Sequence, residues 1–200
     1  MSVPKGKQRP SRFEAAHHFY EVRREITTLI ILDFGFSEEK YQKNIEKYRQ
    51  AHAHSENVDE IVARYEKKCQ NFKARFINRE ADAVLELLRN IETEFSIGNS
   101  INISETPAKL IEFIARRIHI NRAIGYCYAL KQELNYTIRT LPVDINKYER
   151  FAGLIDKQIG LYKGVRHGDN KRIGAGKHTL TDALDGFVAV IKTALEQGNL

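Results

Sequence analysis

Three arginine–histidine pairs are the residues in this sequence whose types and spacing could perform catalysis. An imidazole can transfer a proton while a nearby guanidinium stabilises phosphate charge, so such a pair could cleave RNA. The chain has 32 lysines and arginines and seven histidines, so these spacings also arise by chance. Only Arg49 and His54 could share a helix, and we interpret all three pairs as surface residues: Arg12–His17, Arg49–His54 and Arg172–His178.

Metal and nucleotide sites are not predicted by the remaining histidines and glycines. His17 and His18 are adjacent, and His52 and His54 are two positions apart, whereas two ligands on one helix face need a four-residue spacing. The stretch Gly174-Ala175-Gly176-Lys177 lacks the full spacing and the preceding strand of a phosphate-binding loop. We therefore expect no catalytic residue, no metal and no cofactor.

Basic side chains carry the chemistry that the sequence favours most. The formal net charge is +6 and the pI is about 9.2, which suits an anionic partner such as nucleic acid, an acidic protein or an anionic membrane. The alternative is an inert basic surface. We predict phosphate contacts, nearly indifferent to base sequence, by seven cations. They are Arg116, Arg117, Arg122, Lys163, Arg166, Lys171 and Arg172.

The elements that must position these cations are long amphipathic helices, because apolar residues recur at three- and four-residue steps. The pattern predicts four core helices: Ser11 to Phe34, Ile77 to Gly98, Pro107 to Leu141 and Asp144 to Arg166. Pro142 ends the third helix and Asp144 can cap the fourth, so a tight corner joins them and they must pack antiparallel. The expected architecture is all-α, an antiparallel up-and-down four-helix bundle.

Each predicted helix has one face expected to be buried. The core positions are Ala15, Phe19, Val22, Ile26, Leu29 and Ile30 in the first helix; Ile77, Ala81, Val84, Leu88, Ile91 and Phe95 in the second; Ile114, Ile118, Ile124, Cys127 or Tyr128, Leu134, Ile138 and Leu141 in the third; and Tyr148, Phe151 or Ala152, Ile155, Ile159 and Tyr162 in the fourth. Arg116 and Arg122 lie largely off the buried face. Asn121 and Glu133 are expected to be buried polar groups that fix the register of the helices.

We expect residues 1–200 to form a single domain. Residues 1–10 predict a mobile basic arm, 37–76 a helical insertion that divides into two helices near 53–57, and 174–200 a C-terminal extension. Only Cys69 and Cys127 are present, so no disulfide framework is expected, and a reducing cytoplasm fits better. No apolar run approaches the ~20 residues that span a bilayer. The basic N-terminus lacks the apolar segment of a secretory signal.

Several segments of the chain, which together cover a little over half of it, resemble one known family. They are Met1-Ser2-Val3-Pro4-Lys5-Gly6-Lys7, Arg23-Arg24-Glu25-Ile26-Thr27, Asp33-Phe34-Gly35-Phe36, Arg122-Ala123-Ile124-Gly125-Tyr126-Cys127, Glu133, Leu141-Pro142-Val143-Asp144-Ile145-Asn146-Lys147-Tyr148, Lys163-Gly164-Val165-Arg166 and Asp169-Asn170. The family is that of the Avd proteins, the accessory variability determinants of diversity-generating retroelements.

The resemblance implies a basic four-helix-bundle protein, pentameric where known, that partners a reverse transcriptase in mutagenic retrohoming and binds nucleic acid. We therefore expect a non-enzymatic accessory subunit whose partners are a reverse transcriptase, RNA or DNA, and copies of itself, with no membrane. Two alternatives stay open. One is a protein-binding adaptor with an acidic partner, and the other is a ribonuclease of the HEPN type that uses one of the arginine–histidine pairs.

Overall fold

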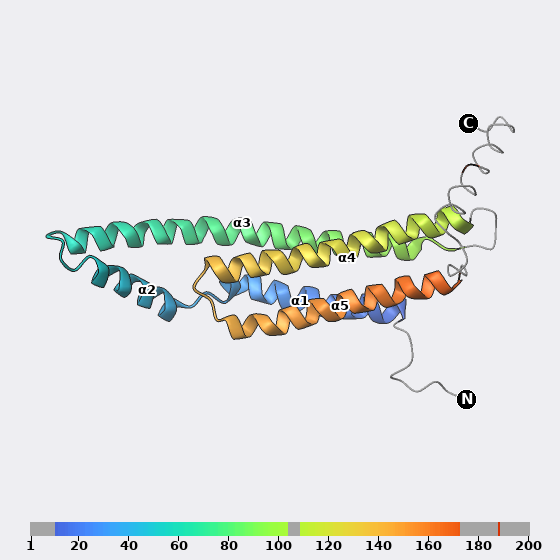
Figure 1. Cartoon of the computed structure of the whole chain (residues 1–200), viewed down its shortest axis with the longest axis horizontal. Helices are drawn as coiled ribbons and strands as arrows, with labels where there is room; N and C mark the ends of the chain where they lie inside the picture. The colour runs from blue at the N-terminus through green and yellow to red at the C-terminus, as the bar shows by residue number, and fades with distance from the viewer. Residues whose placement is uncertain (1–10, 104–108, 173–187, 189–200) are drawn as a thin grey trace. The chain divides into compact units, whose positions relative to one another are not determined.

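Helices make up nearly all of the structure that this computed structural model describes, which covers residues 11–103, 109–172 and 188 (Figure 1). The elements are α1 (Arg12–Ile31), the short 3-10 helix η2 (Asp33–Gly35), α2 (Glu38–Ala51), α3 (Val58–Ser100), α4 (Lys109–Thr140) and α5 (Ile145–Arg172). No strand occurs in these ranges, and Phe36 and Val143 form an isolated antiparallel bridge. The all-α class is confirmed. The predictions for 1–10 and 174–200 concern residues that, Val188 apart, lie outside the described ranges.

The first helix begins where the sequence predicts. The Ser11 hydroxyl accepts a hydrogen bond from the Glu14 backbone N–H at 2.9 Å, which satisfies one of the N–H groups left open at a helix start. Its predicted buried face is confirmed, with Ile30 half-buried and the other positions buried: Ala15, Phe19, Val22, Ile26 and Leu29. The helix ends at Ile31 rather than at Phe34, because the backbone leaves the helical conformation there.

Three consecutive residues with positive φ separate α1 from α2. The φ angles of Asp33, Phe34 and Gly35 are 50°, 58° and 69°, a region that residues with a side chain rarely occupy. The Phe34 side chain is fully buried, and its carbonyl oxygen accepts a hydrogen bond from the Tyr148 hydroxyl at 2.7 Å. Burial and this hydrogen bond offset the strain of these backbone angles.

α3 is longer than the second core helix that the sequence predicts, Ile77 to Gly98. The expected break near 53–57 is confirmed, since α2 ends at Ala51 and α3 starts at Val58. The expected boundary at Ile77 is wrong, because α3 is one continuous helix of 43 residues through Ser100. Gly98 does not stop it. A Cβ at Gly98 would lie 3.1 Å from the His119 Cβ on α4, so the glycine allows the two helices to approach closely.

The corner between α4 and α5 forms as the sequence predicts. The Leu141 N–H still bonds to the Thr137 carbonyl at 2.9 Å, and the chain then turns through Pro142. The Asp144 carboxylate accepts the Asn146 N–H at 3.2 Å, which caps α5. α5 continues six residues beyond the predicted end at Arg166, to Arg172. No helix among the described residues is long and apolar enough to cross a membrane.

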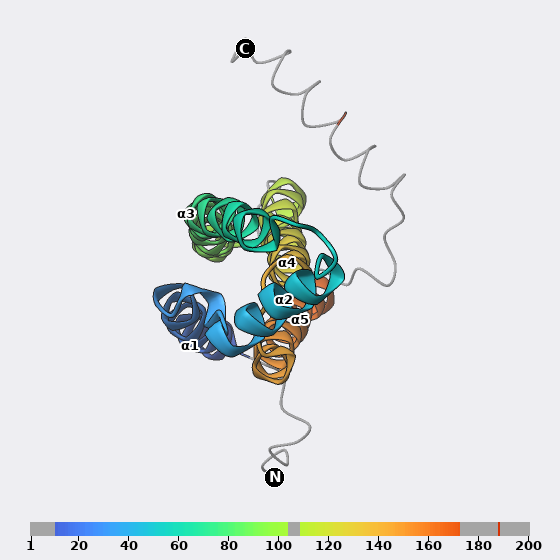
Figure 2. The ribbon, with the colours of Figure 1, turned by 90° about the vertical axis from the view of Figure 1, so that its left-hand side faces the viewer.

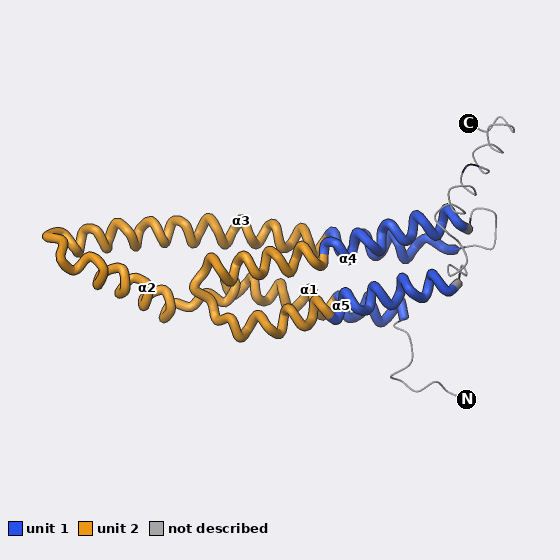
Figure 3. The backbone as a smooth tube through the Cα atoms, in the orientation of Figure 1, with its two compact units in different colours: residues 1–19, 90–126, 157–200 blue, residues 20–89, 127–156 orange. Residues whose placement is uncertain are grey.

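The chain divides into two compact units, shown in Figure 3. Unit 1 comprises residues 1–19, 90–126 and 157–200, and unit 2 comprises residues 20–89 and 127–156. α1, α3, α4 and α5 each contribute to both units, whereas α2 belongs to unit 2 alone. The single domain over 1–200 and the four-helix bundle both stay predictions.

Within unit 2, α2 and the start of α3 lie side by side as a hairpin (Figures 1 and 2). The Tyr48 ring on α2 stacks on the Tyr65 ring on α3, with centroids 3.9 Å apart and planes within 9°. The Ser37 hydroxyl caps α2 by accepting the Lys40 N–H at 3.3 Å. At the base of the hairpin, the Lys40 ammonium donates to the Val143 carbonyl at 2.8 Å. The predicted insertion is therefore fastened to the α4–α5 corner.

The core of unit 1 contains polar side chains at positions that hydropathy does not reveal. His18 on α1 is buried, and its Nδ1 lies 2.7 Å from the Gln158 Oε1 on α5. The Gln158 amide nitrogen also donates to the Ala15 carbonyl at 3.0 Å, so α1 and α5 are joined by two buried hydrogen bonds.

On α5 the predicted apolar face is confirmed: Tyr148, Phe151, Ile155, Ile159 and Tyr162 are all buried.

The predicted buried face of α4 is correct only in its second half. In the first half Ile114 and Ile118 are 37% and 46% exposed, and the buried residues are Phe113, Arg116, Ile120 and Ala123. From Ile124 onward the prediction is confirmed, with Ile138 half-buried, Cys127 buried and Tyr128 exposed. An arginine at a core position shifts the apparent hydrophobic pattern by one or two residues, which explains the error.

Candidate nucleic-acid interface

Arg116 is the predicted cation that the structure removes from the interface. Its side chain is 0% exposed, and its Nε donates to the Asp169 carboxylate at 2.6 Å. Its Nη1 donates to the carbonyl oxygens of Ile101 at 3.1 Å and Asn99 at 3.4 Å. The guanidinium is therefore neutralised inside unit 1, and an external phosphate cannot reach it without opening the helices.

Two other predicted cations lie close together where α4 and α5 pack against each other in unit 1. The Arg117 Nη1 donates to the Asn170 Oδ1 at 2.5 Å, and the Arg166 Nη1 donates to the Asn121 Oδ1 at 2.8 Å. Asn121 lies four residues after Arg117 on α4, whereas its partner Arg166 lies four residues before Asn170 on α5. The two helices therefore run antiparallel here. The two hydrogen bonds are about 6 Å apart along the helices, from a rise of 1.5 Å per residue. We call Arg117 and Arg166 the arginine pair.

The partners of the arginine pair leave its charge in place. Asn121 and Asn170 are neutral amides, so each fixes a guanidinium in position without cancelling its positive charge. Neither side chain of the pair is buried. Two oriented guanidiniums that keep their charge and reach solvent are suited to phosphate oxygens, which they can bind through paired N–H groups.

Arg122 is a weaker candidate for a phosphate contact. Its Nη1 lies 3.7 Å from a Glu94 carboxylate oxygen, and its side chain is 58% exposed. The other Glu94 oxygen lies 2.7 Å from the His119 Nδ1. Glu94 therefore offsets part of the charge of Arg122, although the guanidinium remains accessible. The prediction for Arg122 stands with a smaller expected contribution.

The remaining predicted cations are on the last part of α5. Lys163 and Lys171 are exposed, and they flank Arg166 along the helix. Arg172 is the final residue of α5, and its side chain lies outside the described part of the chain. The structure thus brings Arg117, Lys163, Arg166 and Lys171 onto two adjoining helices of unit 1.

Asn121 and Asn170 are the site residues whose role sequence reasoning missed. Asn121 is exposed, so the expectation that it is a buried group fixing the register is wrong. The only signal for Asn170 was its place in the Asp169-Asn170 segment of the family resemblance. Asp169 itself is buried and forms an ion pair with Arg116.

The arginine–histidine pairs do not gain support from their positions. α2 ends at Ala51, so His54 lies beyond the helix that contains Arg49, contrary to expectation. The Arg49 Nη1 also bonds to the Asp59 carboxylate at 2.5 Å. On α1, Arg12 lies 3.6 Å from the buried Asp169, whereas His17 is exposed. The third pair, Arg172–His178, extends outside the described residues.

A buried carboxyl group on α3 was not predicted. Burial raises the pKa of Glu80 above its ordinary value of 4.5, and the nearby Glu133 carboxyl on α4 raises it further, against the opposing effect of Arg79. The Arg79 Nη2 donates to the Glu80 Oε1 at 3.2 Å, while the Glu80 Oε2 is buried without a hydrogen-bond partner. Protonation of Glu80 is therefore easier in the folded chain than in the unfolded one.

Replacing Glu80 with glutamine is expected to flatten the dependence of stability on pH. Because the folded-state pKa is raised, the contribution of Glu80 is fully present below about 4.5 and is lost as the pH rises through the folded-state pKa. The free energy of unfolding of the variant should therefore increase relative to that of the wild type as the pH rises. Urea unfolding at pH 4.5 and pH 7.5 measures this difference, with Glu86→Gln on the exposed face of α3 as control. An identical difference at both pH values would contradict the assignment.

Among the described residues, no group of three or more histidine, cysteine, aspartate or glutamate side chains could hold a metal ion. Comparison with known proteins found no matching family model, no matching curated protein and no matching solved structure.

Proposed function

We propose that this protein is a non-enzymatic, nucleic-acid-binding accessory subunit of a reverse transcriptase, of the Avd type. The sequence resemblance supports the polymerase as partner. One observation supports the nucleic acid: the arginine pair, in which Arg117 and Arg166 are fixed by asparagines and keep their charge. In this proposal α1, α3, α4 and α5 form an antiparallel four-helix bundle, and α2 with the start of α3 is an insertion.

The mechanism of binding is electrostatic. The arginine pair, Lys163 and Lys171 would contact phosphates, and the release of condensed counterions would supply most of the affinity. Contacts to phosphates position a strand but do not read its bases, so RNA and DNA of different sequences should bind with similar affinity. No residue acts as a catalyst in this proposal, and no metal or cofactor is required.

Exposed apolar residues on α1 support self-association. Phe13, Tyr20 and Ile31 are exposed and are spaced by seven and eleven residues, which returns to the same face of a helix. The resemblance implies a ring of five. Light scattering at micromolar concentration should give a mass near five chains, and a clean monomer would refute this part of the proposal.

The reverse transcriptase is tested most directly in the genome. A reverse-transcriptase gene next to this one, with a template repeat and a variable repeat, is the expected arrangement. Cys69 and Cys127 are both free thiols, which agrees with the reducing cytoplasm in which such a polymerase works. A neighbourhood without a reverse transcriptase, combined with strong binding to an acidic protein, would favour the adaptor alternative.

Removing the arginine pair is expected to weaken binding and its salt dependence. In the variant Arg117→Ala/Arg166→Ala, the slope of log affinity against log salt concentration should fall by about 1.4–1.8, at roughly 0.7–0.9 per lost phosphate contact. Fluorescence anisotropy with single-stranded RNA and DNA of the same sequence, over a series of salt concentrations, measures the slope.

The matched control removes two exposed cations that carboxylates already neutralise. Lys43 and Arg64 lie 2.6 Å and 2.9 Å from Glu39 and Glu60, so Lys43→Ala/Arg64→Ala removes the same formal charge elsewhere. The control should keep the wild-type slope. If both double variants lose the same slope, only net charge matters and the arginine pair is not an interface.

A further inference from the structure

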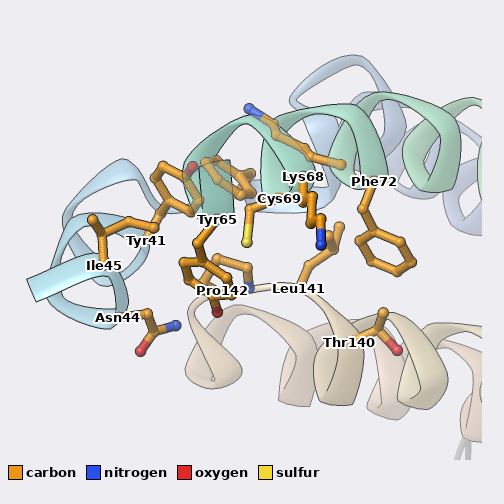
Figure 4. Close-up of a pocket in the computed structure, with 12 residues that line it drawn as sticks. Tyr41, Asn44, Ile45, Tyr65, Lys68, Cys69, Phe72, Thr140, Leu141 and Pro142 are labelled. Carbon is orange, nitrogen blue, oxygen red and sulfur yellow. The ribbon is translucent and has the colours of Figure 1, made fainter. Parts of the chain in front are cut away.

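Unit 2 contains a pocket of about 350 Å³ between α2, α3 and the α4–α5 corner, drawn in Figure 4. This volume is within the range of roughly 300–1,000 Å³ of small-molecule sites in proteins. All the residues that line it belong to unit 2, so it is separate from the arginine pair of unit 1. Neither the charge pattern nor the proposed function accounts for it.

Aromatic rings form much of the wall of this pocket. Tyr65 and Phe72 come from α3, seven residues apart on one helix face, while Tyr41 comes from α2 and Phe36 from the segment before it. The Tyr65 ring is held in place by stacking on the Tyr48 ring. Phe72 is 52% exposed, an unfavourable state for a large apolar side chain that a flat ligand would relieve. The walls therefore suit a planar ring.

The polar groups of the pocket favour an anion with hydrogen-bonding edges. Lys68 is exposed, and the Lys73 ammonium lies 3.6 Å from the centre of the Phe36 ring. Lys73 is also 3.9 Å from Asp33, which offsets part of its charge, but none of the described residues that line the pocket is acidic. Asn44 and Thr140 provide amide and hydroxyl groups.

We propose that this pocket binds a nucleotide, with the base stacked among the aromatic rings and the phosphate beside Lys68. Aromatic rings with adjacent cations are the combination by which proteins hold unpaired nucleotides, since every base has a flat face and every nucleotide a negative charge. The source is a free mononucleotide or an unpaired nucleotide within a strand. The second source rests on the proposed function, and the first does not.

Cys69 gives the pocket a built-in reporter. Its thiol projects from α3 toward the corner at Leu141 and Pro142 (Figure 4). The other cysteine, Cys127, is buried, and burial raises its pKa to about 12, so it reacts slowly with alkylating agents. Alkylation of the native protein by iodoacetamide therefore reports on Cys69, and mass spectrometry of the peptides confirms which thiol has reacted.

Adenosine monophosphate is expected to protect Cys69 from alkylation. At ten times its Kd, a ligand that covers the thiol leaves about a tenth of the sites open and slows the reaction about ten-fold. Adenosine and inorganic phosphate, at the same concentration, should protect much less, because each offers only half of the contacts. If either protects as well as the nucleotide, the proposal is overturned.

Two variants test the named contacts. Phe72→Ala should raise the nucleotide concentration for half-protection by about five-fold or more, from roughly 1–3 kcal/mol per stacked base. Lys68→Ala should raise it as well, while Lys43→Ala, on α2 outside the pocket, should not. Circular dichroism checks that each variant is folded. If Lys68→Ala and Lys43→Ala have equal effects, Lys68 acts only through the net charge of the protein, and the proposed phosphate contact is overturned.

The two sources, and the proposed function, give separable results. If a single-stranded oligonucleotide protects Cys69 at a lower concentration of nucleotide units than the mononucleotide does, the site binds a nucleotide within a strand. If the mononucleotide protects at the lower concentration, the site binds a free nucleotide. The Arg117→Ala/Arg166→Ala variant should keep its protection by the mononucleotide even if it no longer binds strands. No protection by either probe at millimolar concentration would exclude the pocket as a nucleotide site and leave the salt-dependence test of the arginine pair unaffected.

Discussion

Replacing Arg116 with alanine is expected to lower the free energy of unfolding by about 3–5 kcal/mol, the cost of leaving one member of a buried ion pair without the other. Asp169 is buried, and its 2.6 Å hydrogen bond to the Arg116 Nε would be lost. Two carbonyl oxygens, of Asn99 and Ile101, would lose a donor as well. Arg12, 3.6 Å from Asp169, can compensate for only part of this.

Urea unfolding followed by circular dichroism measures this loss, with an unchanged denaturant slope as the sign that the native state is intact. Arg122→Ala is the control, because that side chain is exposed and its carboxylate partner lies 3.7 Å away, a pair worth at most about 1 kcal/mol. The double replacement Arg116→Met/Asp169→Leu should recover much of the stability, since apolar residues of similar size can replace a buried ion pair. A loss from Arg116→Ala no larger than that of the control would show that the pair is open to water.

Replacing Phe34 with alanine is expected to cost about 3–5 kcal/mol of unfolding free energy, the usual loss for a fully buried phenylalanine. Phe72→Ala is a matched control on the same residue type, and it should cost far less because half of that ring is already exposed. Chemical denaturation of both variants measures the two losses. Equal losses would mean that the Phe34 ring does not anchor the segment between α1 and α2.

The positive φ of Phe34 adds a second expectation at the same position. At φ 58° a glycine is unstrained, whereas alanine still has a Cβ. Phe34→Gly should therefore be more stable than Phe34→Ala by up to about 1 kcal/mol, the reverse of the order found in a helix. The opposite order in the denaturation curves would show that the backbone at this position relaxes once the ring is removed.

Local chemistry explains which parts of the fold could be predicted from the sequence. The Ser11 cap, the Pro142 corner and the buried faces of α1 and α5 depend on residues close together in the chain, so a single sequence contains the signal. The continuity of α3 through Ile77 could not be predicted, because the stretch before Ile77 is highly charged and therefore predicts a separate, solvated helix unless its packing partner, here α2, is known.

The candidate site, like the fold, could be predicted only in part from the sequence. The identity of the cations is visible in the sequence, but their state is not, since it depends on partners far along the chain. Arg116 and Arg117 are adjacent, yet Asp169 neutralises the first and Asn170 leaves the second charged, and both partners are 53 residues away. The aromatic pocket was missed because its walls come from three separated segments, of which the first two predict little more than a helical insertion and the third predicts only a tight corner.

The hydrogen bond between His18 and Gln158 has a consequence for how the chain folds as it leaves the ribosome. The two residues are 140 positions apart, so the buried partner of α1 is synthesised only after most of the chain has emerged. Contacts between α4 and α5 depend on the same last helix, but they join neighbours across a short corner, so they form faster than a contact between residues 140 positions apart. The first helix made is therefore among the last to dock, and until then its apolar face is exposed to other nascent chains and to chaperones.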